Sequence, residues 1–535
     1  MAAYEMKSHN ASVVSRGEAR SSESVHERDN AHLQRMGKKP VLKRNFGILS
    51  ILGFSCTILG TWEGMLGTWQ DPLENGGPGG TIYAFIFGWV GTIALFIVLS
   101  ELVSMAPTSG GQYHWAAMLA PQSSFKFVSY ITAWFAVCGW QCAFAACAFL
   151  CGTMIQGAAI MGNAHYPALP WQGTLIVWLA LCFALVVNVA GGKLLPRMEA
   201  IILVVHILGF FGIVIPLTYM ADHRDSHFVF LDFENNGKFA TQGLSWFVGM
   251  TNCAFAFGGG DAAVHMSEEV ANAARVIPNA MMLTVGINGC LGFGMIIAVL
   301  FCVGDLEKAL NSPTGYPFME MFYQATNSVP GTLAMTSIML IIYTCSLMGL
   351  LAAASRQFWS FSRDRGVPGW RWWSQISPSR QVPINAIILT VIVSTLLALI
   401  NIGSSVALSD ILSMAVTGVY LSYLMVAVLL LIRRLRGEVT HSNDAEDDVV
   451  NVPGAKLVWG PFHCPGIWGV LVNTYAVMYL SIVVFFSVWP SKMNPKYDEM
   501  NYAVVGVGSV FILSVVYYFV RARHIYAGPV VEASL

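Results

Sequence analysis

Charged residues are scarce in this sequence of 535 residues. Lys, Arg, Asp and Glu together make up 11% of the chain, whereas hydrophobic residues make up 55%. A soluble globular domain carries about 25% charged residues, so the composition excludes that class and indicates a membrane protein. The formal net charge is -1 and the chain has no cluster of basic residues, so we expect no nucleic-acid partner.

The sequence also lacks the patterns of an enzyme, a metalloprotein or a disulfide-bonded protein. Ten of the eleven cysteines lie in apolar segments without metal-type spacing, and Cys464 lies in a polar loop. No nucleophile constellation or phosphate-binding loop is present. We therefore expect no enzymatic activity, no cofactor and no metal. Residues 1–44 contain no apolar run of the kind that a signal peptide needs, and they predict a disordered tail.

Long apolar segments fill most of the remaining chain. Twelve of them reach about 20 residues, the length that spans a bilayer. They lie near 46–70, 80–104, 127–156, 171–190, 197–220, 242–265, 279–303, 330–355, 383–402, 407–432, 467–489 and 502–521. An even number places both ends of the chain on one side of the membrane. Because Lys and Arg mark the cytosolic side, we expect cytosolic N- and C-termini. Only five of the 29 then fall outside: Arg224, Lys238, Lys308, Lys492 and Lys496.

Two of the twelve segments are interrupted near mid-membrane. In the sixth, three consecutive glycines (258–260) precede Asp261, and each glycine in a helix costs roughly 1 kcal/mol relative to alanine. In the first, Gly60 and Gly64 bracket Glu63. The two segments are five apart, and two consecutive units of five helices have opposite topology. Glycine-interrupted segments at matching positions of two halves predict an inverted-repeat transporter whose binding site lies between the breaks.

Five motifs carry a resemblance to a known family. They are GTWEG with NGGPGG (60–64 and 75–80, the first helix and its outer loop), SELVSMAPTSGGQYHWAA (100–117), NVAGGKLLPRME (188–199), FGGGDAAVHMSEE (257–269) and ASRQFWSFSRDRGVP (354–368). Over residues 45 to 520 the chain resembles the amino acid–polyamine–organocation superfamily, in particular its fungal amino acid, GABA and choline permeases. The resemblance implies the leucine-transporter-type fold, with a 5+5 inverted repeat plus two helices, and secondary active uptake.

The expected organisation follows from the segments and the resemblance together. A cytosolic tail (1–44) precedes an inverted-repeat transport core (45–436). A cytosolic loop (437–466), the last two helices (467–523) and a cytosolic C-terminal tail (524–535) complete the chain.

The resemblance also implies a set of substrate-binding residues, because unwound helices in this superfamily offer backbone N–H and C=O groups to the substrate. Simple close packing of helices is the alternative role for these glycines. Aromatic walls from Trp140 and Tyr343 are further candidates. The implied shell comprises Gly60, Thr61, Trp62, Glu63, Gly64, Phe255, Phe257, Gly258 and Gly259.

Three ionisable side chains are candidates for proton coupling. A carboxylate near mid-membrane is costly, so Glu63 is a functional candidate: it would pair with a substrate ammonium, carry a proton, or hydrogen-bond the unwound backbone. Asp261 would couple protons or cap the second half of the sixth helix. His206 lies nine residues after Arg197, a spacing at which prokaryotic relatives place a lysine, and its alternative role is a hydrogen-bonded core residue.

An inner gate is expected where the sixth helix leaves the membrane. Glu268 and Glu269 would pair with basic groups there, and the alternative is a solvated acidic helix end. The candidate partners are Arg275, Arg363 and Arg365.

These features together predict a twelve-helix permease for a small amine-bearing solute, driven by protons. Amino acids, including GABA, are the first expectation, and choline or a polyamine the second. A receptor that binds amino acids without transporting them is the alternative of another class. The expected partners are the solute, protons and the lipid bilayer, in the plasma membrane or else the vacuolar membrane.

Overall fold

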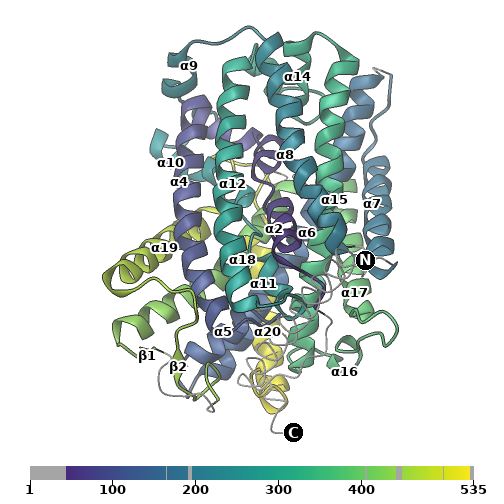
Figure 1. Cartoon of the computed structure of the whole chain (residues 1–535). Coiled ribbons are helices and arrows are strands. Elements are labelled where there is room, and N and C mark those ends of the chain that lie inside the picture. Colours follow the sequence, from purple (N-terminus) through teal and green to yellow (C-terminus); the bar gives the residue numbers. More distant parts are fainter. Residues whose placement is uncertain are drawn as a thin grey trace, which may run out of the picture.

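The structure is a computed structural model that describes residues 44–163, 165–190, 195–403, 406–441, 449–497 and 499–529. It is a bundle of long helices that run between two ends of the molecule (Figure 1). Eleven helical stretches among the described residues are long and apolar enough to cross a membrane. The predicted all-α, multi-pass membrane architecture is therefore confirmed. The predicted tails (1–44 and 524–535) lie largely outside the described residues.

Each predicted segment has a helical counterpart, and two counterparts are broken. The first is α2 followed by α3, and the sixth is α10 followed by the short α11, which is why it is not among the eleven. The bounds are α2 Ile48–Leu59, α3 Thr61–Gly67, α4 Gln70–Met105, α6 Phe125–Gly162, α7 Pro170–Ala190, α8 Leu195–Met220, α10 Gln242–Ala256, α11 Ala262–His265, α12 Ala273–Cys302, α15 Val329–Arg363, α17 Ile384–Leu397 continued by the 3-10 turn η2 Ala398–Ile402, α18 Ala407–Leu435, α19 Gly466–Phe486 and α20 Ala503–Val520.

Short elements cover the two ends of the bundle. In Figure 1, α9 and α14 lie at one end, and α16 with the strands β1 and β2 lies at the other. The two strands pair in parallel through two residues each. The bounds are α5 Gln112–Leu119, α9 Ser226–Leu231, η1 Ser267–Glu269, α13 Leu306–Leu310, α14 Pro317–Thr326, α16 Trp370–Trp373, η3 Ala522–His524, β1 Val439–Thr440 and β2 Leu457–Val458.

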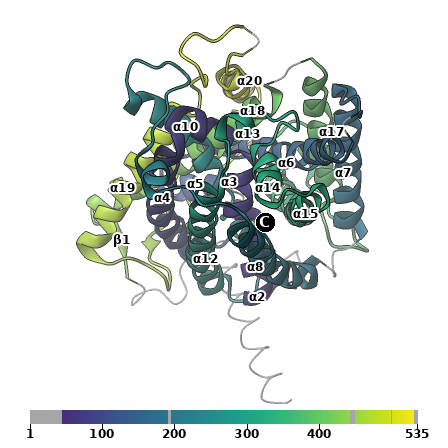
Figure 2. The same ribbon diagram turned by 90° about the horizontal axis from the view of Figure 1, so that it is seen from above.

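The broken helices lie inside the bundle, enclosed by the longer ones. The first, α2, packs against α8, α12 and α15, while α10 packs against α4. Seen from above, α3 lies near the centre and α7, α17 and α20 lie at the rim (Figure 2). The rim helices expose large apolar side chains such as Leu179 (70% exposed) and Val520 (74%). An apolar outer surface of this kind faces lipid in a membrane protein.

The loop expected after the first helix is shorter than predicted. Residues 75–80 belong to α4, which is kinked at Gly77, where φ is 69° and ψ is −173°. The left-handed φ suits glycine, and the N–H of Gly79 donates to the carbonyl oxygen of Asp232 at 2.9 Å. Pro78 follows the kink directly and so falls in the first turn of a new helical run, where proline is tolerated. The prediction of an outer loop over NGGPGG was therefore wrong.

Candidate functional site

The two broken helices meet at their breaks. Gly60 separates α2 from α3 with φ 41°, and Gly259 lies between α10 and α11 with φ 96°, both in the left-handed region that favours glycine. A Cβ added at Gly259 would lie 3.1 Å from Cγ2 of Ile58, on the first helix. A Cβ added at Gly64 would lie 3.1 Å from the Cβ of Ala256. The glycines therefore allow the two interrupted backbones to approach each other.

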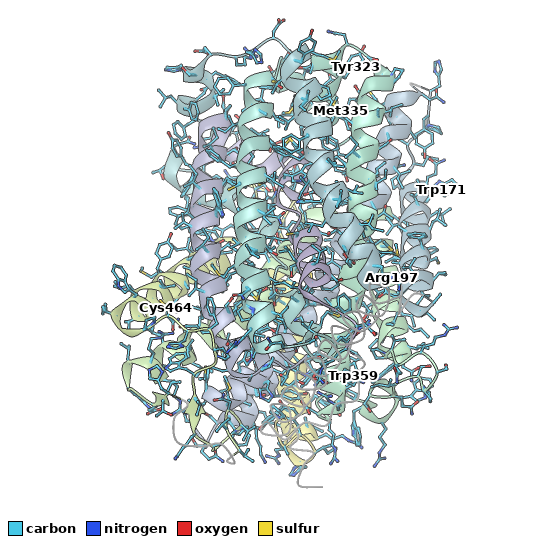
Figure 3. The ribbon with its side chains drawn as sticks, viewed as in Figure 1. Trp171, Arg197, Tyr323, Met335, Trp359 and Cys464 are labelled. Carbon is cyan, nitrogen blue, oxygen red and sulfur yellow. The ribbon has the colours of Figure 1, made fainter. Side chains whose placement is uncertain are left out.

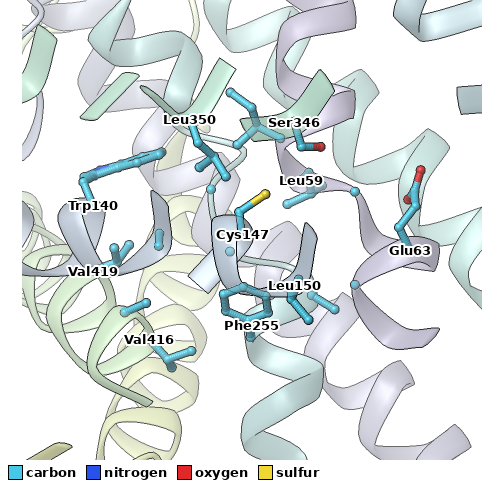
Figure 4. Close-up of a pocket in the computed structure, with 18 of the residues that line it drawn as sticks. Leu59, Glu63, Trp140, Cys147, Leu150, Phe255, Ser346, Leu350, Val416 and Val419 are labelled. Carbon is cyan, nitrogen blue, oxygen red and sulfur yellow. The ribbon is translucent and has the colours of Figure 1, made fainter. Parts of the chain in front are cut away.

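A cavity of about 60 Å³ lies against the two breaks. A cavity needs about 10–15 Å³ of this volume to hold one water molecule, so the cavity has room for water or a small solute. Most of its lining is apolar, and Glu63 is the one charged residue among the described residues that form it. Figure 4 shows Glu63 and Trp140 on opposite sides of this cavity, with Phe255 and Cys147 between them.

Six of the nine expected substrate-binding residues line the cavity, and three do not. The side chain of Trp62 is fully buried and faces α8, where its ring lies 6.3 Å from that of Phe210. Phe257 packs on Phe85 of α4, with the ring centroids 4.9 Å apart. The N–H of Thr61 donates to Oδ1 of Asn288 at 3.2 Å. The six that do line the cavity are Gly60, Glu63, Gly64, Phe255, Gly258 and Gly259.

Four aromatic side chains contribute to the cavity wall. Trp140 and Tyr343 were candidates from the sequence, and Phe255 belonged to the expected shell. Tyr420, on α18, was missed, since its helix has no break and its charged residues lie only near its two ends. Its hydroxyl donates to the carbonyl oxygen of Ala254 at 2.9 Å, next to the break in the sixth helix.

The carboxylate of Glu63 is paired with His206. Oε1 of Glu63 lies 2.6 Å from Nδ1 of His206, and both side chains are buried, at 2% and 0% exposed. Oε2 of Glu63 has no hydrogen-bond partner among the described residues, and neither has Nε2 of His206. Oε2 lies beside Gly60, 3.6 Å from where a Cβ of that glycine would be. The structure therefore brings two of the three proton-coupling candidates together at the cavity, with one carboxylate oxygen free.

The backbone around the cavity is held by two side chains of α15. The hydroxyl of Tyr343 donates to the carbonyl oxygen of Glu63 at 2.8 Å, and that of Ser346 donates to the carbonyl oxygen of Thr57 at 2.5 Å. At the other break, the N–H groups of Gly259 and Gly260 have no backbone acceptor in the described part of the chain. These two groups are free donors next to the cavity.

Asp261, the third proton-coupling candidate, has a different setting. It makes no side-chain cap hydrogen bond to α11, so the capping prediction was wrong. Its carboxylate instead accepts from Nε2 of Gln112 at 2.6 Å and from the hydroxyl of Tyr423. Nε2 of His265 lies 3.8 Å away. Asp261 therefore joins the sixth helix to α5 and α18 and does not line the cavity.

The expected inner-gate acids form buried ion pairs, and one partner was missed. Arg363 makes a two-pronged pair with Glu268 at 2.8 and 3.0 Å. Nε of Arg356 lies 3.0 Å from Oε1 of Glu269. The two arginines are seven residues apart on α15 and so lie on one face of that helix. Arg275, by contrast, is exposed and has no carboxylate within ion-pair distance among the described residues.

Arg365, the third candidate partner in the inner gate, is not part of these ion pairs. It is exposed, and its guanidinium lies 5.1 Å from the ring centre of Trp370.

Glu199 is fully buried on α8, and neither of its carboxylate oxygens has a partner among the described residues. It lies seven residues before His206, on the same face of the helix, and packs on the backbone at Gly53 of α2.

The fold indicates a class: a polytopic, all-α membrane transporter with two interrupted helices. A model of the amino acid permease family matches residues 46–510, so the chain belongs to this family. The family is one of transporters rather than of enzymes. The predicted superfamily, and a permease for amino acids or related amines, are thereby confirmed.

Curated relatives cover most of the chain. A putative amino acid/polyamine transporter of Macrophomina phaseolina is 29% identical over 84% of this chain and 96% of its own length. The amino-acid permease BAT1 of Arabidopsis thaliana is 28% identical over 93% of this chain and 95% of its own length. A choline transporter of Saccharomyces cerevisiae is 28% identical over 90% of this chain and 82% of its own length.

Proposed function

We propose that the protein imports a small amino acid, with GABA as the leading candidate, together with a proton. The observation that carries the proposal is the small cavity between the two breaks. Among the described residues that line it, Glu63 alone is charged, and it is hydrogen-bonded to His206. A carboxylate buried in a membrane protein is energetically costly, so such a residue is by default a candidate for substrate binding or proton transfer.

The two ends of an amino acid find complementary groups around the cavity. The ammonium would bind the free oxygen Oε2 of Glu63 and face the aromatic walls, where a cation over a ring gains about 0.5–2 kcal/mol. The carboxylate would accept from the free N–H groups at Gly259 and Gly260. The small volume of the cavity favours small solutes over aromatic amino acids or long polyamines.

Charge balance at the Glu63–His206 pair favours symport for a zwitterion. A protonated His206 and an ionised Glu63 are neutral together, whereas loss of the proton leaves an uncompensated buried negative charge. The two charges of an amino acid cancel each other, so its binding does not replace the proton. The proton then travels with the substrate and is released when water reaches the pair from the cytosol.

Alternating access would come from joint movement of the broken helices. The chain before the first helix is tied to the sixth: the N–H of Phe46 donates to the carbonyl oxygen of Glu269 at 3.1 Å. The pairs Glu268–Arg363 and Glu269–Arg356 hold this unit to α15 and would close the inner side. Breaking them would let α2 and α11 tilt away from α15 and open the cavity to the cytosol.

The proposed orientation places the α16 end of the molecule in the cytosol. Arg371 lies on α16, and Arg436 lies between α18 and β1 at the same end of the molecule. Basic side chains mark the cytosolic side of a membrane protein, which supports this orientation. The proposed location is the plasma membrane, where an acidic exterior would drive protons inward.

Choline is the second candidate substrate, and the aromatic wall favours it. Quaternary ammonium groups are bound by cages of aromatic rings, and four aromatic side chains line this cavity. A relative is named a choline transporter. Choline has no carboxylate to offset its charge, so it would replace the proton at Glu63 rather than accompany it.

A single uptake experiment separates these proposals. Radiolabelled GABA, other amino acids, choline and a polyamine are supplied to cells that lack their own permeases, at external pH values from about 5 to 8. Amino-acid symport requires uptake that rises as the medium is acidified, whereas choline uptake would fall because protons compete. A protein that reaches the surface and transports none of these solutes would contradict both proposals.

A further inference from the structure

A second, larger cavity lies at the rim of the bundle and shares no lining residue with the cavity at the breaks. Its volume is about 430 Å³, and it is formed by α6, α17, α18 and α20 together with the end of α15, the turn before α16 and Trp373 of α16. Almost every side chain in it is apolar, and the exception, Gln141, donates from Nε2 to Oγ1 of Thr390 at 3.0 Å. Representative lining residues are Val137, Phe358, Leu389, Val393, Met414 and Val510.

The cavity is a groove that opens towards lipid. Both α17 and α20 pack on α6, but they lie apart at the rim (Figure 2). Both are membrane-spanning helices with exposed apolar side chains, so the space between them is in contact with acyl chains. An apolar space of this kind binds apolar groups rather than ordered water.

One end of the groove is cationic. A neighbouring cavity of about 300 Å³ shares Pro368 with the groove and is lined by the guanidinium-bearing Arg371 and Arg521. Both arginines are exposed, and neither forms an ion pair with a carboxylate in the described part of the chain. Among the described residues, no acidic side chain lines either cavity. The rings of Trp370 and Tyr517 complete this end, and aromatic side chains of this kind are enriched where membrane proteins meet the lipid headgroups.

We propose that the groove and its cationic end form a binding site for an anionic phospholipid. The phosphate and the negatively charged headgroup would be held by Arg371 and Arg521, since guanidinium groups bind phosphate through two parallel hydrogen bonds. One acyl chain would lie in the apolar groove beside Val393 and Val510. In the proposed orientation this is a lipid of the cytosolic leaflet, where anionic lipids are concentrated.

The apolar groove and the two arginines at its end together favour an anionic phospholipid over other ligands. A sterol would fill the groove without using either arginine, and a free phosphate compound would use the arginines without the groove. Only a ligand with a negative headgroup and a long apolar chain uses both cavities through their common residue, Pro368.

Native mass spectrometry of the full-length protein in detergent tests the proposal. Phosphatidylserine and phosphatidylcholine with identical acyl chains are added separately, and glycerophosphoserine supplies the headgroup without chains. The wild-type protein is expected to bind phosphatidylserine more tightly than phosphatidylcholine, and glycerophosphoserine only weakly. Equal affinity for the two lipids, or glycerophosphoserine binding as tight as that of the lipid, overturns the proposal.

Variants tie the binding to this site. The double substitution Arg371→Gln, Arg521→Gln is expected to weaken phosphatidylserine binding roughly 25-fold, at about fivefold for each arginine near an anionic headgroup. The control Arg436→Gln, Lys456→Gln removes two exposed positive charges from the same end of the molecule and is expected to change little. If both double variants lose binding equally, or neither does, the proposed site is wrong. Thermal unfolding checks that each variant remains folded.

A third variant tests the groove itself. Val393→Trp fills the apolar space and leaves the arginines unchanged. It is expected to weaken both lipids and to leave the weak binding of glycerophosphoserine unaltered. Unchanged phosphatidylserine binding in this variant would refute the acyl-chain part of the proposal.

Discussion

Replacing Glu63 by glutamine tests how the cavity handles charge. The substitution keeps the size of the side chain but removes the acceptor charge that lies 2.6 Å from Nδ1 of His206. A hydrogen bond to a charged group contributes about 1.5–3 kcal/mol. If the substrate ammonium depends on the same carboxylate, its binding should weaken about 10- to 150-fold. The fall in affinity should be accompanied by loss of the pH dependence, because no carboxylate remains to hold a proton on His206.

The assay compares uptake and exchange by wild-type and Glu63→Gln protein at equal surface expression. Net uptake of the zwitterionic substrate by the wild type should rise on acidification, and that of Glu63→Gln should be low and flat. Asp261→Asn is the matched control, since it alters a second buried carboxylate that does not line the cavity. If Asp261→Asn flattens the pH profile and Glu63→Gln leaves it intact, the reasoning about the Glu63–His206 pair is refuted.

Three other predictions concern the gate, the buried acid of α8 and the orientation. Arg356→Gln leaves the carboxylate of Glu269 buried without a cation, which costs about 3–5 kcal/mol. The inner side should therefore open, and a cytosolic thiol reagent should reach the cavity faster. Arg275→Gln, at an exposed arginine, should behave as wild type, and equal accessibility in both variants would refute the gate. Glu199→Gln should raise the thermal unfolding temperature or leave it unchanged if the carboxyl is protonated when α2 covers it, and a clear loss of stability would show that Glu199 is charged and paired. The proposed orientation places Cys464 in the cytosol, so it should react with an impermeant maleimide only after permeabilisation. The reaction should be faster as the pH is raised, because burial and the nearby Glu101 raise the pKa of the thiol. A Cys464→Ser variant is the control, and labelling of intact cells would overturn the orientation.

Labelled side chains show why the thiol experiment reports on orientation. Figure 3 places Cys464 and Trp359 towards the end of the molecule that carries α16 and the strands, and Tyr323 at the opposite end. The backbone around Cys464 is fixed, because its N–H donates to Oε1 of Glu101 at 2.7 Å and its carbonyl accepts from Arg434. Whether the reagent labels Cys464 therefore depends on which side of the membrane this residue faces.

The sequence predicted the helices and the two breaks because local composition determines both. Apolar runs of membrane-spanning length gave the spans, and consecutive or closely spaced glycines marked the positions where the backbone leaves the helical conformation. Glu63 stood out because a carboxylate is rare at that depth. The pairing of Glu63 with His206 could not be read from the sequence, since nothing in a sequence gives the rotation of α8 against α3.

The residue positions that the sequence did not predict depend on how the helices are rotated and packed against one another. Trp62 and Glu63 are adjacent in sequence, but successive residues of a helix point about 100° apart, so one faces α8 and the other lines the cavity. Tyr420 and Arg356 lie on unbroken helices, and their roles follow from which helices pack beside the breaks. Glu199 was part of a quoted motif, but its burial follows from the close approach of Gly53 of α2.

The central claim is that the solute binds in the cavity between the two breaks, and equilibrium binding of the transported solute to purified protein tests it most directly. Ala143 lines this cavity on a regular stretch of α6, so Ala143→Leu fills part of a space of only about 60 Å³ without straining the backbone. Ala159→Leu, on the same helix and outside the cavity lining, is the matched control. Ala143→Leu is expected to abolish solute binding while its thermal unfolding stays near the wild-type temperature, and Ala159→Leu is expected to bind normally. Wild-type affinity in Ala143→Leu would show that the solute does not bind in this cavity.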